Sequence, residues 1–150
     1  MSGYSVDQRL SELGIVLETD LKPLANYVSV QKGGDFWFFS GTGPSVRGRL
    51  GENMTAAEGY QAARLAGINL LSVLRIELEG DWDRLDQIIK VNGYVNCTPD
   101  FYEQPEVING TSDLLVEVLG ERGRHARTAV GTNSLPFRIP VEVEMIVRVK

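Results

Sequence analysis

The sequence predicts an α+β domain in which two long helices pack on one face of a mixed β-sheet. Two segments carry apolar residues at helical spacing, and the C-terminal segment alternates apolar with charged residues, as a half-buried strand does. The expected order of elements is helix, hairpin, helix, strand, helix and two strands. A length of 150 residues with 43% hydrophobic residues is ordinary for one domain with its own core. We therefore expect a single domain over residues 1–150, with residues 1–24 as an N-terminal helical extension.

A short helix and a hairpin are expected first. Ser5, followed three residues later by Gln8, is typical of a capped helix start, and Gly14 is typical of a helix end. Residues 26–31 and 36–40 are β-branched and aromatic, and the Lys-Gly-Gly-Asp sequence between them favours a tight turn.

Two long helices are expected next. Thr55 and Glu58 form a capping-box pattern after a loop rich in glycine and proline. The helix that begins there carries apolar and small residues on one side: Tyr60, Ala63, Ala66, Gly67, Leu70, Leu71, Leu74 and Leu78. A second helix is expected over residues 106–119, where an apolar stripe is followed by Gly120.

Three strands complete the prediction, over residues 85–96, 127–130 and 141–149. A single sheet with helices on only one face leaves its other face open. Self-association is the simplest cover for that face in a chain this short, so we expect an oligomer.

Composition narrows the possible partners and location. The net charge of −5 argues against binding to nucleic-acid backbones, which depends on neutralising phosphates with Lys and Arg. No apolar run reaches the roughly 18 residues of a membrane span, and the first residues lead into a polar helix rather than an apolar signal region. The single Cys97 cannot form an internal disulfide. We expect a cytoplasmic protein with no membrane partner, and nucleic acid is not an expected partner.

Cofactor signatures are missing from the sequence. One histidine and one cysteine cannot build the usual zinc spacings. Gly41-Thr42-Gly43 is followed by Pro44 and lacks the later glycine of a dinucleotide loop, and no Gly-Lys-Ser/Thr phosphate loop occurs. The expectation is a site without metal or organic cofactor.

Arginines and carboxylates gather in the C-terminal third. Arg127, at the start of a strand, can offer a rigid fork to a carboxylate, and Glu142, on what we expect to be the neighbouring strand, can move a proton. Glu144 shares the strand face of Glu142 and is a second candidate for the proton carrier. In the alternative interpretation, Arg122 and Arg124 are solvated loop charges, and both glutamates face solvent on an edge strand.

Short motifs along the chain carry a family resemblance. The C-terminal ones are Arg127-Thr128-Ala129-Val130-Gly131, Leu135-Pro136 and Val141-Glu142-Val143-Glu144. The earlier ones are Tyr27, Phe39-Ser40-Gly41 with Pro44, Asp100-Phe101 and Val107-Ile108-Asn109. In this order they resemble the reactive-intermediate deaminase family, also called RidA or YjgF-like, from about Ala25 to the C-terminus.

The resemblance implies a chorismate-mutase-like fold and a homotrimer with sites between subunits. Known members hydrolyse reactive enamines and imines to 2-oxo acids and ammonia, with no cofactor. Carried over to this chain, Arg127 would clamp the substrate carboxylate, and Glu142 would position or activate the attacking water. Tyr27, Ser40 and Asn109 would line the pocket and orient the ligand.

The chain also departs from the family pattern. Well-studied short members have a cysteine two residues after the arginine, where this chain has Ala129. The N-terminal helix, a longer loop between Ser40 and Thr55 and an insertion over residues 102–105 are typical of a longer branch, so the resemblance does not fix the substrate.

Two other functions stay open. The same arginine pocket could hold a small carboxylate metabolite without turnover. Some family members are described as endoribonucleases, and here that function would rest on the cluster of Arg122, Arg124, His125 and Arg127.

Overall fold

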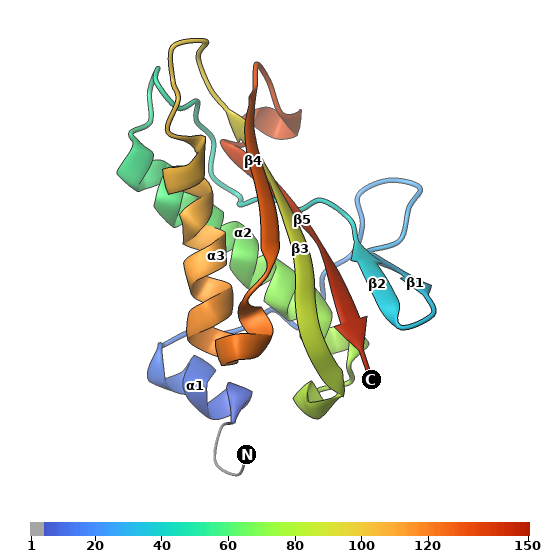
Figure 1. Cartoon of the computed structure of the whole chain (residues 1–150). Coiled ribbons are helices and arrows are strands. Elements are labelled where there is room, and N and C mark those ends of the chain that lie inside the picture. Colours follow the sequence, from blue (N-terminus) through green and yellow to red (C-terminus); the bar gives the residue numbers. More distant parts are fainter. Residues whose placement is uncertain (1–4) are drawn as a thin grey trace.

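The computed structural model of the protein describes residues 5–150, and five strands of this part form one mixed sheet (Figure 1). The sheet order is β1-β2-β5-β3-β4. The strands are β1 (Val30–Gly33), β2 (Phe36–Phe39), β3 (Leu85–Asn96), β4 (Ala126–Thr132) and β5 (Val141–Val149). The helices are α1 (Val6–Glu12), α2 (Ala56–Glu77) and α3 (Gln104–Leu119), with short 3₁₀ turns at Trp82–Arg84, Gly120–Gly123 and Pro136–Arg138.

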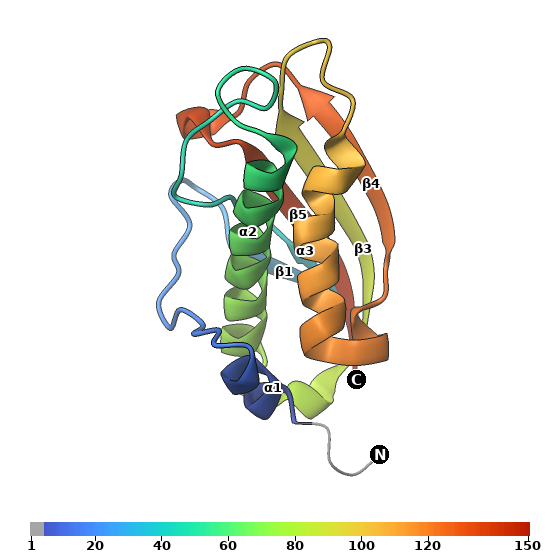
Figure 2. The ribbon, with the colours of Figure 1, turned by 90° about the vertical axis from the view of Figure 1, so that its left-hand side faces the viewer.

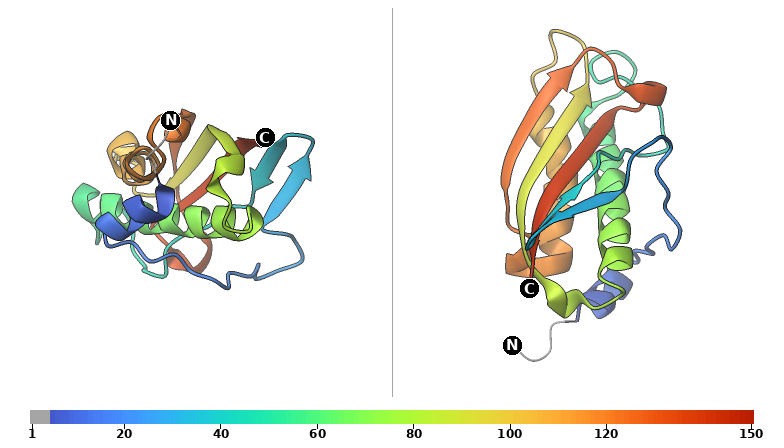
Figure 3. Two further views of the ribbon diagram at one scale, coloured as in Figure 1. Left: turned by 90° about the horizontal axis from the view of Figure 1, so that it is seen from below. Right: turned by 90° about the vertical axis from the view of Figure 1, so that its right-hand side faces the viewer.

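Two layers make up the molecule. Helices α2 and α3 lie side by side across one face of the sheet (Figure 2). The other face carries no helix within residues 5–150 (Figure 3). This arrangement confirms the predicted α+β class with two long helices on a single face.

The strand order follows from how the strands are connected. Strand β3 passes through α3 into β4 and pairs with it in parallel, because a helical crossover returns the chain in the same direction. Strand β5 then lies on the other side of β3, antiparallel to it from Leu85↔Val149 to Val95↔Val141, and it pairs with β2 on its outer side. The last strand of the chain is therefore in the middle of the sheet.

The core lies between the sheet and the two long helices. Alternate residues of β5 are buried at 0–5% exposure: Val141, Val143, Met145, Val147 and Val149. The helices contribute leucines at helical spacing, including the fully buried Leu71, Leu74, Leu114 and Leu115. A reciprocal capping box between Thr55 and Glu58 starts α2, as the sequence predicts.

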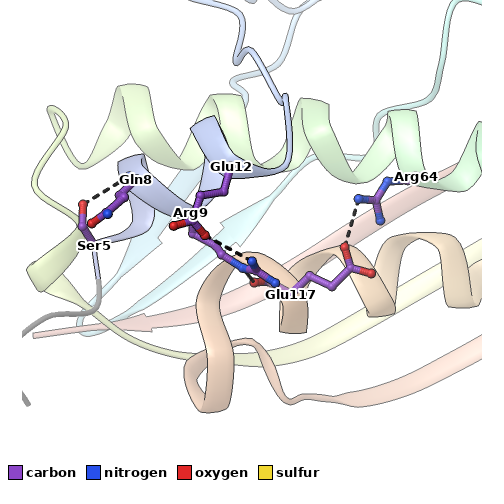
Figure 4. A network of polar contacts seen from close by, with 6 residues as sticks. All are labelled: Ser5, Gln8, Arg9, Glu12, Arg64 and Glu117. Carbon is purple, nitrogen blue, oxygen red and sulfur yellow. Dashed lines mark hydrogen bonds and ion pairs between the residues drawn. The ribbon is translucent and has the colours of Figure 1, made fainter.

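The N-terminal segment is attached to the helical layer through α1 and through the chain that follows it. Val6 and Leu10 of α1 are buried, and Arg9 Nε donates a 2.9 Å hydrogen bond to the carbonyl oxygen of Glu117 on α3 (Figure 4). The Glu117 carboxylate also pairs with Arg64 of α2 at 3.0 Å. Farther along the chain, the main-chain N–H of Glu18 donates to Ser72 Oγ of α2 at 3.0 Å. The segment therefore runs along the helices as part of the domain.

Most elements match the predicted ranges, and the differences lie at their ends. Strands β3 and β5 have the predicted bounds, whereas α3 begins two residues earlier than predicted. Strand β1 starts only at Val30, because residues 26–29 do not pair with β2. The Ser5 side chain caps α1, whose last residue is Glu12. Among residues 5–150, none of the helices combines the length and hydrophobicity that crossing a bilayer requires.

Gly110 sets the distance between the two long helices. A Cβ atom at this position would overlap the carbonyl oxygen of Tyr60 on α2. We predict that Gly110→Ala lowers the free energy of unfolding by roughly 2–3 kcal/mol, because the clash is with main chain, which cannot rotate away. Urea denaturation checks this, with Gln61→Ala on the exposed side of α2 as a control. Equal stability of both variants would contradict the close approach.

Candidate functional site

A cleft of about 910 Å³ opens beside β5. Its walls are the N-terminal segment, the loop after β2, the turn at Pro136–Arg138 and one side of α2. This volume lies within the usual range for small-molecule sites. Tyr27, Ser40, Glu142 and Glu144 line it, so three of the residues singled out by resemblance meet in one cleft together with the alternative proton carrier.

Glu142 is the carboxylate best suited to exchange a proton in this cleft. Its side chain is half-buried, and burial raises its pKa above the usual range, with a smaller contribution from the nearby negative charge of Glu144. Gly41 lies directly against it, since a Cβ atom there would be 3.1 Å from Glu142 Cδ. A raised pKa lets a carboxyl group act as an acid as well as a base close to neutral pH.

Glu144 is held by a tyrosine from the neighbouring strand. Tyr94 Oη donates a 2.6 Å hydrogen bond to Glu144 Oε1, and this bond is the main reason that the pKa of Tyr94 rises to about 12. The Glu144 carboxylate is thus oriented by a phenol that stays protonated. Glu142 has no such partner among residues 5–150, which makes it the better candidate of the two for meeting a ligand or water.

Ser40 and Tyr27 are positioned by the start of the hairpin. Ser40 Oγ donates a 2.6 Å hydrogen bond to the carbonyl oxygen of Val28, and its main-chain N–H donates to Ser29 at 2.9 Å. The hydroxyl oxygen keeps its capacity to accept a bond from a ligand. Tyr27 is 47% exposed beside it.

Arg127 lies elsewhere, with its guanidinium anchored on α3. Its Nη1 donates to Asn109 Oδ1 at 2.7 Å and to Ser112 Oγ at 3.3 Å, and its Nη2 donates to the Pro105 carbonyl oxygen at 3.4 Å. Within residues 5–150 these bonds leave the Nε proton without an acceptor. The Nε/Nη2 edge therefore stays available for a carboxylate, while the Nη1 side fixes the plane of the group.

His125 and Ser112 continue this polar cluster. His125 Nδ1 lies 2.6 Å from the carbonyl oxygen of Gly123, and Nε2 lies 2.8 Å from Ser112 Oγ. Burial lowers the pKa of His125, with a small contribution from the charge of Arg127. Sequence reasoning missed Ser112, although its position three residues after Asn109 places both on one side of a helix.

The predicted site residues thus form two separate groups on one chain. Tyr27, Ser40 and Glu142 line the cleft, whereas Asn109 and Arg127 meet at the junction of α3 and β4. The expectation that Arg127 and Glu142 lie on neighbouring strands is wrong, because β3 separates β4 from β5. The two side chains also lie on opposite faces of the sheet, since Arg127 reaches α3 while Glu142 alternates with valines buried under the helices.

The alternative interpretation of the charges is also corrected in part. Arg122 is not a solvated loop residue, because its Nη1 donates to the main-chain oxygens of Trp82 and Leu85 at 2.7 and 3.1 Å. Arg124 is exposed, as that interpretation had it, and pairs with Glu121 at 3.1 Å. Strand β5, which carries the glutamates, is an inner strand of the sheet.

The part of the chain that the structure describes has no candidate metal site. Residues 5–150 contain no group of three or more His, Cys, Asp and Glu side chains placed to hold a metal ion. The groups available for chemistry there are a fixed guanidinium, two carboxyls and a histidine–serine pair.

The sequence and the fold match a known class of small α+β proteins. Residues 9–147 match the model of the family described as "YjgF/chorismate mutase-like, putative endoribonuclease". The chain is 42% identical over 149 residues to Protein TCP17 of Trypanosoma cruzi, covering 95% of this chain and 92% of that protein. The chain therefore belongs to the YjgF/chorismate-mutase-like family, which confirms the resemblance seen in its motifs.

Solved structures agree with this assignment. A protein of unknown function from Agrobacterium tumefaciens is 40% identical, with a TM-score of 0.90, covering 97% of this chain and 92% of that one. A Shewanella oneidensis protein named "putative endoribonuclease" is 31% identical, with a TM-score of 0.90, covering 96% of this chain and 99% of that one.

The charge of Glu144 gives a test of the cleft electrostatics. We predict that Glu144→Gln lowers the pKa of Glu142, because it removes a nearby negative charge that disfavours ionisation. The pKa should stay above the usual glutamate range, since burial is the larger cause. Carboxyl-carbon NMR titration measures it, with the exposed Glu79→Gln as a control. An unchanged pKa in Glu144→Gln would show that the two carboxyls do not interact.

Proposed function

We propose that this protein hydrolyses reactive 2-enamines and 2-imines to 2-oxo acids and ammonia, at a site completed by a second copy of the chain. The observation that carries the proposal is the Arg127 guanidinium, which is fixed on α3 with its Nε/Nη2 edge available. This edge suits the carboxylate of a 2-imino acid, because two parallel N–H groups match two carboxylate oxygens.

Glu142 supplies the second requirement of the reaction. Water must add to the carbon of the C=N bond, and the nitrogen must leave as ammonia, so one group has to take a proton and return it. A half-buried carboxyl with a raised pKa is suited to both steps. Ser40 and Tyr27 in the same cleft offer hydroxyl groups that can orient the substrate or the water.

The positions of the two groups support completion of the site by a second copy. Arg127 and Glu142 lie on opposite faces of the sheet and cannot reach one ligand within a single chain. The sheet face that carries no helix in Figure 3 exposes Phe36 and Phe38 at 40% and 49%, and a second copy would cover it. A cyclic trimer in which one copy contributes Arg127 and the next contributes the cleft meets both needs.

A binding protein without turnover is the second candidate. It uses the same Arg127 fork and needs no proton transfer from Glu142. An endoribonuclease has less support: the family description and a relative's name suggest it, but Arg122 is engaged with main-chain oxygens and His125 with Ser112.

A mixing experiment tests catalysis and shared sites together. Ammonia release is measured from 2-imino acids generated in place by an amino-acid oxidase. Arg127→Ala and Glu142→Gln alone should each lower the rate on the order of 10²-fold or more. Unfolding and reassembling the two variants as a mixture should restore about one quarter of the sites, because each intact site draws one half from each variant.

The double variant Arg127→Ala/Glu142→Gln provides the matched control. Mixed with Arg127→Ala, it contributes no intact arginine and should restore nothing. If the wild type turns over the substrate but mixing the single variants restores no activity, the deaminase function stands and the shared site is rejected. If the wild type shows no turnover, the proposed deaminase function is rejected.

Direct binding separates the two candidate functions. We predict that 2-oxobutyrate binds to the wild type and to Glu142→Gln with similar affinity, and that Arg127→Ala loses about 2 kcal/mol or more of binding, because its charged fork is gone. Calorimetry measures both. Arg127→Lys is the informative companion, since it keeps the charge without the fork and should recover only part of the affinity. Binding in the wild type without turnover would favour the binding protein.

A further inference from the structure

Ser112 and His125 form a polar pair that the proposed deamination does not use. They lie at the junction of α3 and β4, away from the cleft that holds Glu142. Both side chains are half-buried, so each keeps part of its surface accessible.

The hydrogen-bond partners fix the form of the imidazole. The carbonyl oxygen of Gly123 can only accept, so the His125 Nδ1 that lies 2.6 Å from it carries the proton. In the neutral ring, Nε2 then accepts, and Ser112 Oγ donates to it across 2.8 Å. Burial lowers the pKa of His125, which favours this neutral form of the ring. A basic nitrogen therefore faces the serine proton.

The positively charged guanidinium of Arg127 lies beside the same Ser112 hydroxyl. Its Nη1 donates to Ser112 Oγ at 3.3 Å, and this bond acts in the same direction as the histidine that accepts the hydroxyl proton, since both favour loss of that proton. A cation at this distance stabilises negative charge that develops on the oxygen or on a group bonded to it. A base, its orienting carbonyl and a cation around one serine are the parts that activate a hydroxyl nucleophile.

We propose that Ser112, His125 and Arg127 form a second reactive centre, in which Ser112 accepts the acyl group of small carboxylic esters. Ser112 Oγ attacks the ester carbonyl carbon, and its proton passes to His125 Nε2. The tetrahedral oxyanion faces the Arg127 guanidinium. The carbon–oxygen bond to the alcohol breaks, and the alcohol oxygen takes the proton from Nε2. Water then attacks the acyl-serine by the same route, which releases a carboxylic acid and restores Ser112.

This activity goes beyond the proposed deamination and does not depend on it. The two share Arg127, but acyl transfer uses neither the cleft beside β5 nor Glu142. The Arg127 edge that remains available favours esters that carry a carboxylate of their own.

The reaction is tested with p-nitrophenyl acetate as the acyl donor. Release of p-nitrophenol is followed together with the intact mass of the protein, and the acetylated residue is located by peptide mapping. The wild type should gain one acetyl group on Ser112. Ser112→Ala should lose this label, and His125→Gln should slow acylation on the order of 10²-fold, because it keeps the serine and removes the base.

Two further variants control for non-specific acylation and for poor folding of Ser112→Ala. Ser134→Ala removes an exposed serine that has no histidine beside it in the described chain, and should leave labelling unchanged. Ser112→Cys keeps a nucleophile next to His125 and should be acylated even if Ser112→Ala folds poorly. An acetyl group mapped to another residue, or equal acylation rates in the wild type and His125→Gln, would overturn the proposal.

Discussion

The pairing of β5 with β3 is the constraint on which the rest of the structure depends. It runs from Leu85↔Val149 to Val95↔Val141, and it places the last strand of the chain inside the sheet rather than at its edge. Because β4 occupies the other side of β3, any group on β4 is a full strand away from any group on β5. The same pairing turns the glutamates of β5 away from the helices, while the arginine of β4 reaches α3. The division of the site into two groups is thus a property of the topology.

Local sequence patterns were sufficient for the elements themselves. Capping residues at Ser5 and Thr55 and the alternation over residues 141–149 specify helices and a strand by interactions within a few residues. The start of β1 was predicted too early, because residues 26–29 have strand composition but no strand to pair with. The expectation that the strands of Arg127 and Glu142 are neighbours was wrong, because which strands pair depends on contacts far apart in the chain that no local pattern records.

The site was predicted as individual residues, but their grouping was not. Side-chain type and motif order singled out Arg127 and Glu142. The structure fixes the plane of the Arg127 guanidinium and partly buries Glu142, which fits the role proposed for each. Arg122 looked like a loop charge because its partners are main-chain oxygens, which have no signature in a sequence. Ser112 was missed for a related reason, since a serine within a helix is common and its histidine comes thirteen residues later, in the loop before β4.

The N-terminal segment forms a wall of the cleft that can vary in sequence independently of the sheet. Residues 21–25 line the cleft, yet the segment carries neither Arg127 nor Glu142. Beyond α1, a hydrogen bond from Glu18 to Ser72 holds the segment to α2. Its side chains, such as the 80% exposed Leu24, set the shape of the cleft mouth from outside the sheet. Substitutions in this segment can therefore change which ligand sizes and polarities the cleft accepts, without altering Arg127 or Glu142. In such a scaffold, the residues that determine ligand selectivity lie on a different segment from the residues proposed to carry out the reaction.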